Sequence, residues 1–259
     1  MHVQFSTDSL ASVDCDLLAI AFGVDLDADL AELEAHFGGQ LSSWASARKF
    51  KGKAGSSLSI PTFGKLAATE LLLVGIGDGG ADAIRDAAAK AGRAARTSQA
   101  RHLALALGQD ASDTAAIVEM VPVGNYNYER YKPESDMTPA LEQLTLIGQA
   151  ETGAMRSASA RGQTRAGAQR WARDLVNHPA AEIYPQSLAD EAARLAEHPD
   201  VTIEIWDETR LEAEDCVGIL AVGQGSDRQP RLIHLSYRPK GAKAHIALVG
   251  KGVTFDSGG

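Results

Sequence analysis

The sequence predicts an α/β protein whose first domain contains a largely parallel sheet. Short apolar runs alternate with helix-forming stretches over about the first 150 residues. A glycine-rich turn joins one of these runs to an alanine-rich stretch, and the alternation resumes in the second half of the chain. Strands that alternate with helices are typical of βαβ units, which build parallel sheets.

The clearest strand, loop and helix lie in the first half. Leu71–Val74 is an apolar run that enters the glycine-rich turn Gly75–Gly80, and the alanine-rich stretch Ala81–Arg96 follows. This order predicts a strand, a loop and a long helix. Further strands are expected at Leu103–Leu107 and Leu144–Gly148.

A composition shift in the middle of the chain predicts a domain boundary. Acidic residues are absent between Glu151 and Asp174, whereas arginines recur there among Ala, Gly, Ser and Gln. Because the later part, Ala166–Val176, favours a helix, we expect a flexible join that runs into a connecting helix. We therefore place an N-terminal α/β domain at residues 1–155, the connecting helix at 156–176 and a second domain at 177–259.

The second domain also alternates helix and strand signals. Ser187, with Asp190 three residues later, has a spacing similar to a capping box and predicts a helix that opens there and ends at about Glu197. Apolar and polar residues alternate over Val201–Trp206, which predicts a half-buried strand. Two more strands are expected at Leu232–Tyr237 and His245–Val249.

Composition bounds the functional classes. The chain has 259 residues, of which 44% are hydrophobic and 23% charged, and this excludes long disorder, collagen and a disulfide scaffold. The net charge of −9 argues against a generally basic nucleic-acid-binding protein, although a local basic patch remains compatible with it.

Cysteine usage and the first residues indicate a cytoplasmic protein without a membrane partner. Cys15 and Cys216 are far apart in the sequence, fit a reducing compartment and are expected to be small buried hydrophobic residues. The N-terminus lacks the basic-then-apolar order of a signal peptide, and no run approaches the roughly 18 apolar residues that cross a bilayer.

The Gly75–Gly80 turn has two interpretations. It matches G-x-G-x-x-G between a strand and a helix, a context in which backbone N–H groups hold a pyrophosphate, so a nucleotide-like ligand is one alternative. Asp110 is then the candidate acid near the end of the next strand. Against this alternative, the Asp78 carboxylate inside the loop repels phosphate, and a plain strand-to-helix turn also requires glycines.

The arginine-rich stretch Arg156–Arg173 also has two interpretations. Several cations on one helix make a local positive field that contacts phosphates, so nucleic-acid binding is a second alternative. The plainer interpretation is a solvated helix face or a contact between subunits. The arginines are Arg156, Arg161, Arg165, Arg170 and Arg173.

Near the end of the chain, Lys251 and Asp256 are the candidate metal ligands. Both lie among glycines after the expected strand His245–Val249, and ligands usually sit at the strand ends of α/β sheets. From the residue types alone, a Lys and an Asp are more often a surface ion pair. A lysine that ligates a metal must be neutral, which requires burial or the cation itself to lower its pKa.

The eleven residues Val249–Gly259 resemble the metal-site signature of the leucine aminopeptidase family, also called the cytosol aminopeptidase family. Three further segments resemble the same family, namely Ala172–Ala180, Gly218–Ser226 and Pro230–Ile233. The resemblance is specific over about residues 170–259. Upstream, Leu71–Asp78 and Tyr126–Lys132 are only compatible with it.

The resemblance implies a fold, an activity and a metal site. It implies a variable N-terminal α/β domain, a catalytic α/β metallopeptidase domain and assembly as a homo-hexamer. Lys251 would ligate one of two divalent metal ions and Asp256 would bridge both, with Mn, Zn or Co as suitable metals. The implied reaction removes an N-terminal residue, often leucine, from a peptide by means of a metal-activated water.

Two departures from the family pattern qualify these expectations. The chain has Ala180-Ala181 and Tyr184-Pro185 where the family usually has Ala-Asn and Thr-Pro, which affects packing or assembly more than chemistry. The remaining carboxylate ligands and the catalytic Lys and Arg lie beyond Gly259 in the family, and the turn-like end of the chain suggests a truncation. We therefore expect no catalytic residue and no cofactor-binding residue other than the two metal ligands, and no activity from these 259 residues alone.

Overall fold

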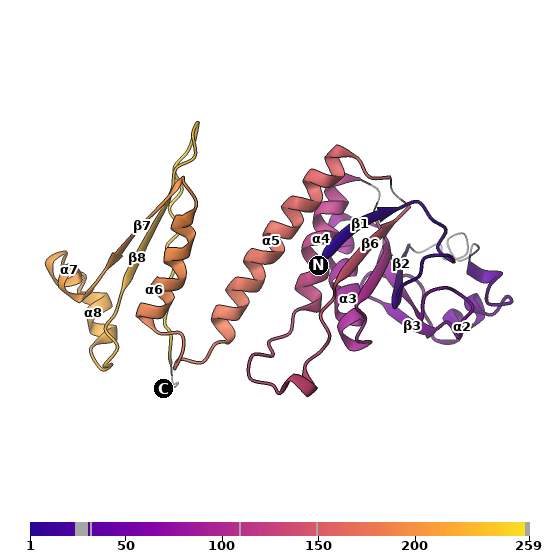
Figure 1. Ribbon diagram of the computed structural model, residues 1–259, viewed down its shortest axis with the longest axis horizontal. Coiled ribbons are helices and arrows are strands. Elements are labelled where there is room, and N and C mark those ends of the chain that lie inside the picture. Colours follow the sequence, from indigo (N-terminus) through magenta and orange to yellow (C-terminus); the bar gives the residue numbers. More distant parts are fainter. Residues whose placement is uncertain (24–30, 32, 109, 149, 257–259) are drawn as a thin grey trace. The chain divides into compact units, whose positions relative to one another are not determined.

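The computed structural model describes residues 1–23, 31, 33–108, 110–148 and 150–256 (Figure 1). The chain forms two compact units, Met1–Ala172 and Arg173–Gly259. Each unit contains a sheet of its own, with six strands in the first unit and two in the second.

The first unit is built on a mostly parallel sheet, as the sequence predicts. Its strands are β1 (His2–Ser6), β2 (Leu17–Gly23), β3 (Ser57–Pro61), β4 (Glu70–Gly77), β5 (His102–Ala106) and β6 (Gln143–Ile147). Their order across the sheet is β1-β6-β5-β2-β4-β3, and only the pairing of β3 with β4 is antiparallel. The expected strands at Leu71–Val74, Leu103–Leu107 and Leu144–Gly148 correspond to β4, β5 and β6.

Strand β4 shows why its sequence is a continuous apolar run. Leu71 and Leu73 face a core cluster that includes the helix α2 (Leu41–Ala47), whereas Leu72 and Val74 face the opposite cluster. A strand that is buried on both faces needs apolar residues at every position rather than at alternate ones. The core of this unit therefore consists of two layers, one on each face of the sheet.

Helices α3 (Ala81–Thr97) and α4 (Ala111–Asn125) pack tightly against each other on one of these faces (Figure 1). Two glycines permit the close approach. A Cβ atom on Gly92 would lie 2.1 Å from the carbonyl oxygen of Val121, and one on Gly124 would lie 2.0 Å from that of Ala89. The strand, glycine turn and long helix predicted from Leu71 to Arg96 are thus confirmed.

The arginine-rich stretch is helical throughout, which corrects the expected flexible join. Helix α5 spans Gly153–Asn177 and buries Ala158, Ser159, Gly162 and Ala166. A Cβ atom on Gly162 would lie 2.6 Å from the carbonyl oxygen of Ala115 in α4. The small residues that suggested flexibility therefore form the packing face of a helix, at the spacing of three and four residues that places side chains on one side.

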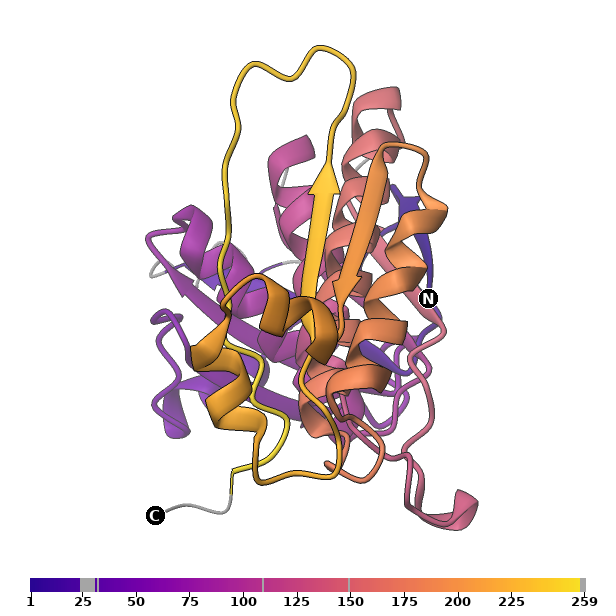
Figure 2. The same cartoon turned by 90° about the vertical axis from the view of Figure 1, so that its left-hand side faces the viewer.

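The second unit contains a two-stranded antiparallel sheet and short helices (Figure 2). Strands β7 (Val201–Trp206) and β8 (Leu232–Tyr237) confirm the two predictions for these ranges. The helices are α6 (Pro185–Ala193), α7 (Glu208–Ala213) and α8 (Val217–Gly223), with short 3-10 helices at η2 (Arg194–Glu197) and, in the first unit, η1 (Glu134–Asp136).

The first helix of this unit begins two residues before the predicted start at Ser187, and the 3-10 helix η2 continues it to the predicted end at Glu197. Helix α6 begins at Pro185, with Tyr184 as its N-cap, and it ends at Ala193. Ser187 lies in the first turn rather than before it, and its hydroxyl accepts a hydrogen bond from the Tyr184 N–H at 2.9 Å. Proline suits the first position of a helix because its missing N–H would have no partner there, so Pro185 sets the start.

The expected strand at His245–Val249 was wrong. Residues 238–256 contain no helix or strand, and Figure 2 shows a long extended segment after β8. Ile246, Leu248 and Val249 are 79%, 94% and 98% exposed. A strand needs neighbouring backbone groups to pair with, and among the described residues none pairs with this segment.

The expected burial of the two cysteines is confirmed for one of them. Cys15 is buried as expected, whereas Cys216 is only half-buried and corrects that expectation.

Across the described ranges, no helix has the length and hydrophobicity that a membrane span requires.

Candidate functional site

The two predicted metal ligands lie on the extended segment that follows β8. Both Lys251 and Asp256 are exposed, and Thr254 between them is half-buried. A Cβ atom on Gly252 would lie 3.6 Å from Cδ2 of Leu188, so the segment passes alongside helix α6. Ser257, Gly258 and Gly259, which end the eleven-residue motif, lie outside the described residues.

An arginine fixes the loop between α8 and β8 to the rest of the second unit. The Arg231 side chain is 17% exposed, and its guanidinium donates to Oε1 of Gln186 and to Oε2 of Glu208, each at 2.7 Å. It also donates to the carbonyl oxygen of Pro230 at 2.8 Å. These charge-assisted bonds join α6, α7 and the start of β8 in one arrangement.

A second arginine joins the segments that carry the family resemblance. Arg228 donates to the carbonyl oxygen of Ala180 at 2.6 Å and to that of Ala181 at 3.3 Å. A Cβ atom on Gly223 would lie 2.9 Å from Pro230, so the end of α8 packs directly on the same loop. The sequence singled out these segments separately, and the structure brings them together.

The Tyr184-Pro185 departure has a structural role. The Arg228 guanidinium carbon lies 4.1 Å from the centre of the Tyr184 ring, which is close enough for a cation–π interaction. Tyr184 also caps α6. The residue that replaces the usual threonine therefore contributes packing at the entry to α6, which agrees with the expectation that this departure concerns packing.

The donors present do not make up a complete metal site. A lysine amine and an aspartate carboxylate suit Mn, Zn or Co, but each metal ion needs about four or more donors. In the described part of the chain, no three His, Cys, Asp or Glu side chains are grouped so that they could hold a metal ion. By themselves, Lys251 and Asp256 would therefore supply only part of a coordination shell.

Another loop of the same chain packs against the glycines at the start of Gly75–Gly80 and accepts hydrogen bonds from their N–H groups. Gly75 and Gly77 donate their N–H groups to the carbonyl oxygens of Ser56 and Gly52, each at 2.9 Å. A Cβ atom on Gly75 would lie 2.1 Å from the carbonyl oxygen of Lys53. The glycines thus permit the close approach of a neighbouring loop, and these N–H groups are already used. This geometry favours the plain turn over a phosphate-binding loop.

Asp110, the candidate acid of the nucleotide alternative, acts as a helix cap. Its side chain accepts a hydrogen bond from the N–H of Asp113 at 2.9 Å, at the start of α4. Aspartate is among the preferred N-cap residues because its carboxylate satisfies an N–H that the helix leaves without a partner. A structural role therefore accounts for this residue.

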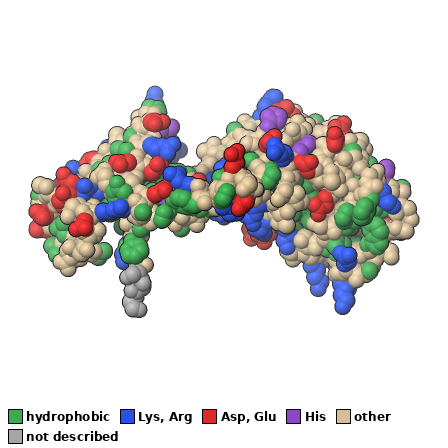
Figure 3. Space-filling model, turned by 60° about the horizontal axis from the view of Figure 1, so that its bottom comes forward, with side chains coloured by type: hydrophobic (Ala, Val, Ile, Leu, Met, Phe, Trp, Pro, Cys, Tyr) green, Lys and Arg blue, Asp and Glu red, His purple; other side chains and the backbone are tan. Residues whose placement is uncertain are grey.

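Two of the arginines on α5 are paired with acids. Arg156 lies 3.5 Å from Glu151, and Arg165 lies 3.6 Å from Glu119. On the face shown in Figure 3, acidic and basic side chains are interspersed rather than separated. Such a surface gives less support to nucleic-acid binding than a continuous basic face would.

Sequence reasoning missed the buried carboxylate to which α5 is attached. The Glu119 side chain is 7% exposed, and it accepts hydrogen bonds from Arg85 at 3.0 Å and from Gln169 at 2.8 Å. The hydrogen bond from Arg85 is the main cause that lowers the pKa of Glu119, while burial opposes it. No local sequence signal marks this cluster, because its members are 34 and 50 residues apart.

Two family models match the chain. The model described as "Cytosol aminopeptidase family, N-terminal domain" matches residues 21–135, and "Cytosol aminopeptidase family, catalytic domain" matches residues 170–259. The second range contains Lys251, Asp256, Arg228 and Arg231.

Curated relatives carry the same family name. A probable cytosol aminopeptidase of Geobacter sp. (strain M21) is 36% identical and aligns with 100% of this chain and 55% of its own length. A probable cytosol aminopeptidase of Corynebacterium diphtheriae is 39% identical over 80% of this chain and 41% of its own length. The chain thus spans about half the length of these relatives.

Solved structures with a similar fold include a leucine aminopeptidase. A mutant of tomato leucine aminopeptidase matches with a TM-score of 0.85 and 26% identity, over 98% of this chain and 55% of that chain. The bottromycin maturation enzyme BotP in complex with Mn matches with a TM-score of 0.65 and 27% identity, over 87% of this chain and 46% of that chain.

Proposed function

The chain belongs to the cytosol aminopeptidase family, and on this basis we propose that it is part of a metal-dependent leucyl aminopeptidase. The observation that carries the proposal is the eleven-residue motif Val249–Gly259, which lies within the range matched by the catalytic-domain model. Its substrates are peptides with a free N-terminus, and the protein acts in the cytoplasm as a homo-hexamer.

Lys251 and Asp256 are the proposed metal ligands. In the complete catalytic domain these two residues would supply some of the ligands of two divalent ions, Mn or Zn, and the bound ions would supply Lewis-acid activation of a water molecule. The Mn complex of the BotP neighbour supports manganese as one of the candidates. The tomato leucine aminopeptidase neighbour supports the leucyl preference.

Residues 1–155 form the N-terminal domain in this proposal, 156–176 the connecting helix and 177–259 the first part of the catalytic domain. Because two donors cannot hold two metal ions, these 259 residues are inactive by themselves. Further ligands and the catalytic Lys and Arg come from other residues of the catalytic domain.

Hydrolysis of leucyl-p-nitroanilide tests the proposal. The 259-residue chain, supplied with Mn²⁺ or Zn²⁺, is expected to release no p-nitroaniline above the rate of the metal salt alone. Hydrolysis that disappears in the Asp256→Ala variant would contradict the inactivity of this chain and would at the same time support the assignment of Asp256.

Calorimetric titration with Zn²⁺ examines the partial site directly. We expect weak binding, with a dissociation constant above about 0.1 mM, because two donors replace few of the water molecules on the ion. Lys251→Met should weaken it further, whereas Lys243→Met, an exposed lysine on the same extended segment, should not. Equal binding by both variants would count against Lys251 as a ligand.

A further inference from the structure

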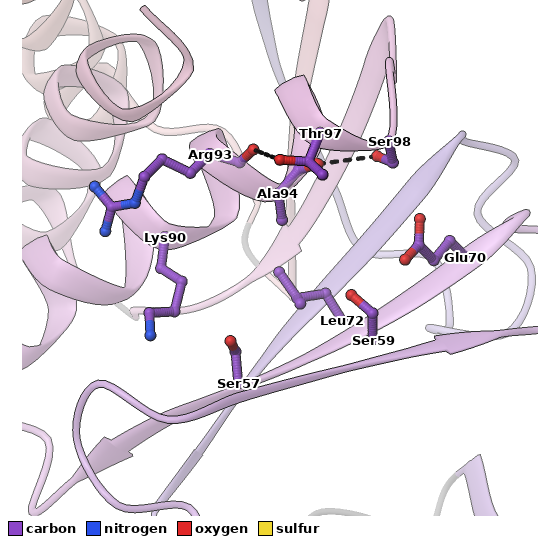
Figure 4. Close-up of a pocket in the computed structure, with 9 residues that line it drawn as sticks. All are labelled: Ser57, Ser59, Glu70, Leu72, Lys90, Arg93, Ala94, Thr97 and Ser98. Carbon is purple, nitrogen blue, oxygen red and sulfur yellow. Dashed lines mark hydrogen bonds between the residues drawn. The ribbon is translucent and has the colours of Figure 1, made fainter.

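A cleft of about 420 Å³ lies in the first unit, between α3 and the strands β3 and β4 (Figure 4). Residues of α3 form one wall, and residues of the two strands form the other. Neither the proposed metal ligands nor the Gly75–Gly80 turn lies in it. Its lining combines cations, hydroxyl groups and a single carboxylate, and this combination indicates a ligand that carries charges of both signs.

One end of the cleft is positively charged. Lys90 and Arg93 lie there on α3, with the hydroxyl of Ser57 on the facing strand (Figure 4). The Lys90 ammonium donates to the carbonyl oxygen of Gly55, which holds it at the rim. Within the described residues, no hydrogen bond or ion pair engages the Arg93 guanidinium, so it is available to a ligand carboxylate.

The other end carries the carboxylate. Glu70 lies at the start of β4, near Thr97 and Ser98 at the end of α3 (Figure 4). Among the described residues, no cation pairs with Glu70. The Thr97 and Ser98 hydroxyls donate to the carbonyl oxygens of Arg93 and Ala94, at 3.0 Å and 3.1 Å, and each hydroxyl oxygen still has a lone pair that can accept a hydrogen bond. A ligand ammonium would find three oxygen acceptors at this end.

The two ends are separated by about the length of three residues of extended peptide. On α3, Thr97 lies seven positions after Lys90, which is about 10 Å along the helix axis at 1.5 Å per residue. Three extended residues span at most about 11 Å. Between the ends, Leu72 and Ala94 provide an apolar floor and Ser59 a polar group.

The sequence places no acidic residue near the positive end of the cleft in the two stretches that form it. Residues 35–69 and 87–109 contain no Asp or Glu, and these are the two stretches that meet at the cleft. Among the residues that the structure describes, Glu70 is therefore the only acid in the lining. A ligand with a negative charge at one end only, such as a phosphate ester, would leave Glu70 without a partner and would be repelled by it if it extended that far.

We propose that this cleft binds a short peptide of about three residues with both termini free. Its carboxylate lies at Lys90 and Arg93, and its ammonium lies at Glu70. The site is distinct from the proposed metal ligands, Lys251 and Asp256, and it does not depend on the aminopeptidase activity. It would give the N-terminal domain of a peptidase a peptide-binding site of its own.

Titration of the ¹⁵N-labelled 259-residue chain with trialanine at pH 7, followed by NMR, tests the proposal. Both termini of the peptide are ionised at this pH. We expect shifts of the amide signals of Ser59, Ala94 and Thr97, with a dissociation constant on the order of a millimolar because the cleft is open. N-acetyl-trialanine and trialanine amide each lack one charge and should bind about three- to tenfold more weakly.

Two charge variants test which end of the cleft binds which terminus of the peptide. Glu70→Gln should make trialanine and N-acetyl-trialanine bind equally, because the ammonium has lost its partner. Arg93→Gln should weaken trialanine about three- to tenfold and leave trialanine amide unchanged. Lys51→Gln, which removes an exposed cation outside the lining, is the matched control and should change nothing.

Equal binding of all three peptides by the unchanged protein, or no binding of trialanine at ten millimolar, would overturn the proposal. Binding of N-acetyl-trialanine as tight as that of trialanine would indicate an anion site instead and would also overturn it. The capped peptides require no variant, so the result stands even if a substitution unfolds the protein. The binding result also does not depend on hydrolysis of the peptide. Recovery of intact trialanine at the end of the titration would show that no hydrolysis has occurred.

Discussion

Substitution of Glu119 should lower the stability of the first unit. Its buried carboxylate is bonded to Arg85 and Gln169, and it lies 3.6 Å from Arg165. Glu119→Gln removes the charge but keeps the size, so we expect the free energy of unfolding to fall by about 1–2 kcal/mol, discounted because Arg85 is 37% exposed. Urea unfolding at pH 7 measures this change.

The exposed pair of Arg101 with Glu142 provides the control. Its two side chains are 64% and 61% exposed, at a similar separation of 2.9 Å. Glu142→Gln should therefore change the unfolding free energy by less than about 0.5 kcal/mol. Equal losses of unfolding free energy in the two variants would mean that the burial of Glu119 contributes nothing to stability.

The same carboxylate gives a prediction about pH. The Arg85 hydrogen bond lowers the pKa of Glu119 below its ordinary value of 4.5, so the folded state binds this proton less readily than the unfolded state. The resulting stability is fully present above about pH 5 and is lost as the pH falls through the folded-state pKa. We expect the difference between the unchanged protein and Glu119→Gln to be constant from pH 7 to 5 and to shrink below about pH 4. A difference that grows toward acid pH would contradict this assignment.

The two cysteines should differ in reactivity. Burial raises the pKa of the Cys15 thiol to about 12, whereas Cys216 is half-buried. Because the thiolate is the reactive form, iodoacetamide at pH 8 should alkylate Cys216 in the folded protein and spare Cys15. Mass spectrometry of peptides locates the label, and both cysteines should react in urea. Labelling of Cys15 at the rate of Cys216 without urea would show that the segment before β2 opens.

Some single residues could be identified from the sequence and others could not. Lys251 and Asp256 stand in a contiguous motif, so the sequence alone was enough to single them out. Glu119 could not be found in this way, because the residues that bond to it come from α3 and α5 and meet it only after folding. Likewise, the cleft that Glu70 helps to line depends on the antiparallel pairing of β3 with β4, which no local sequence pattern predicts.

At the scale of elements, the contact between α3 and α4 depends on small residues. Gly124→Ala would place a Cβ atom 2.0 Å from the carbonyl oxygen of Ala89. Alanine favours a helix over glycine by about 1 kcal/mol, but the clash forces the helices apart, so we expect a net loss of about 2 kcal/mol or more. Thermal unfolding followed by circular dichroism measures it.

Gly167 on α5 is the matched control. Nothing lies within 4 Å of the position where its Cβ would be, so Gly167→Ala tests helix propensity alone. It should raise the free energy of unfolding by up to about 1 kcal/mol. If both substitutions were stabilising, the close contact of α3 with α4 would not constrain the fold.

The elements that the sequence predicted well are those whose signals are local. The run Leu71–Val74, its glycine turn and the alanine-rich helix form one strong pattern, and all three are present. The pattern of His245–Val249 is equally apolar, yet the segment has no strand to pair with among the described residues. Helix α5 was partly missed because small residues at a packing face have the same composition as a flexible linker.

At the scale of the whole molecule, the alternation of strands and helices was enough to predict the α/β class and the parallel sheet. Strand order was not predictable, since β1 lies beside β6 and β2 between β5 and β4. These neighbours are far apart in sequence, so their pairing depends on the complete core rather than on any one segment. The antiparallel edge strand β3 was missed for the same reason.

Models of one family match residues 21–135 and 170–259 of this chain, which spans 55% of the Geobacter sp. relative. A chimera that joins this chain to the remaining part of that relative therefore offers the most direct test of the proposed function. Arg228 and Arg231, which connect the family segments in the second unit, remain unchanged in it.

The decisive measurement is the rate of leucyl-p-nitroanilide hydrolysis by this chimera with Mn²⁺ or Zn²⁺, compared with its Asp256→Ala variant. We predict metal-dependent hydrolysis that falls by at least about 100-fold in the variant, because the substitution would remove the proposed Asp256 ligand from the metal site. If the variant hydrolysed the substrate as fast as the unchanged chimera, Asp256 would not be a metal ligand, and the proposed site would be wrong.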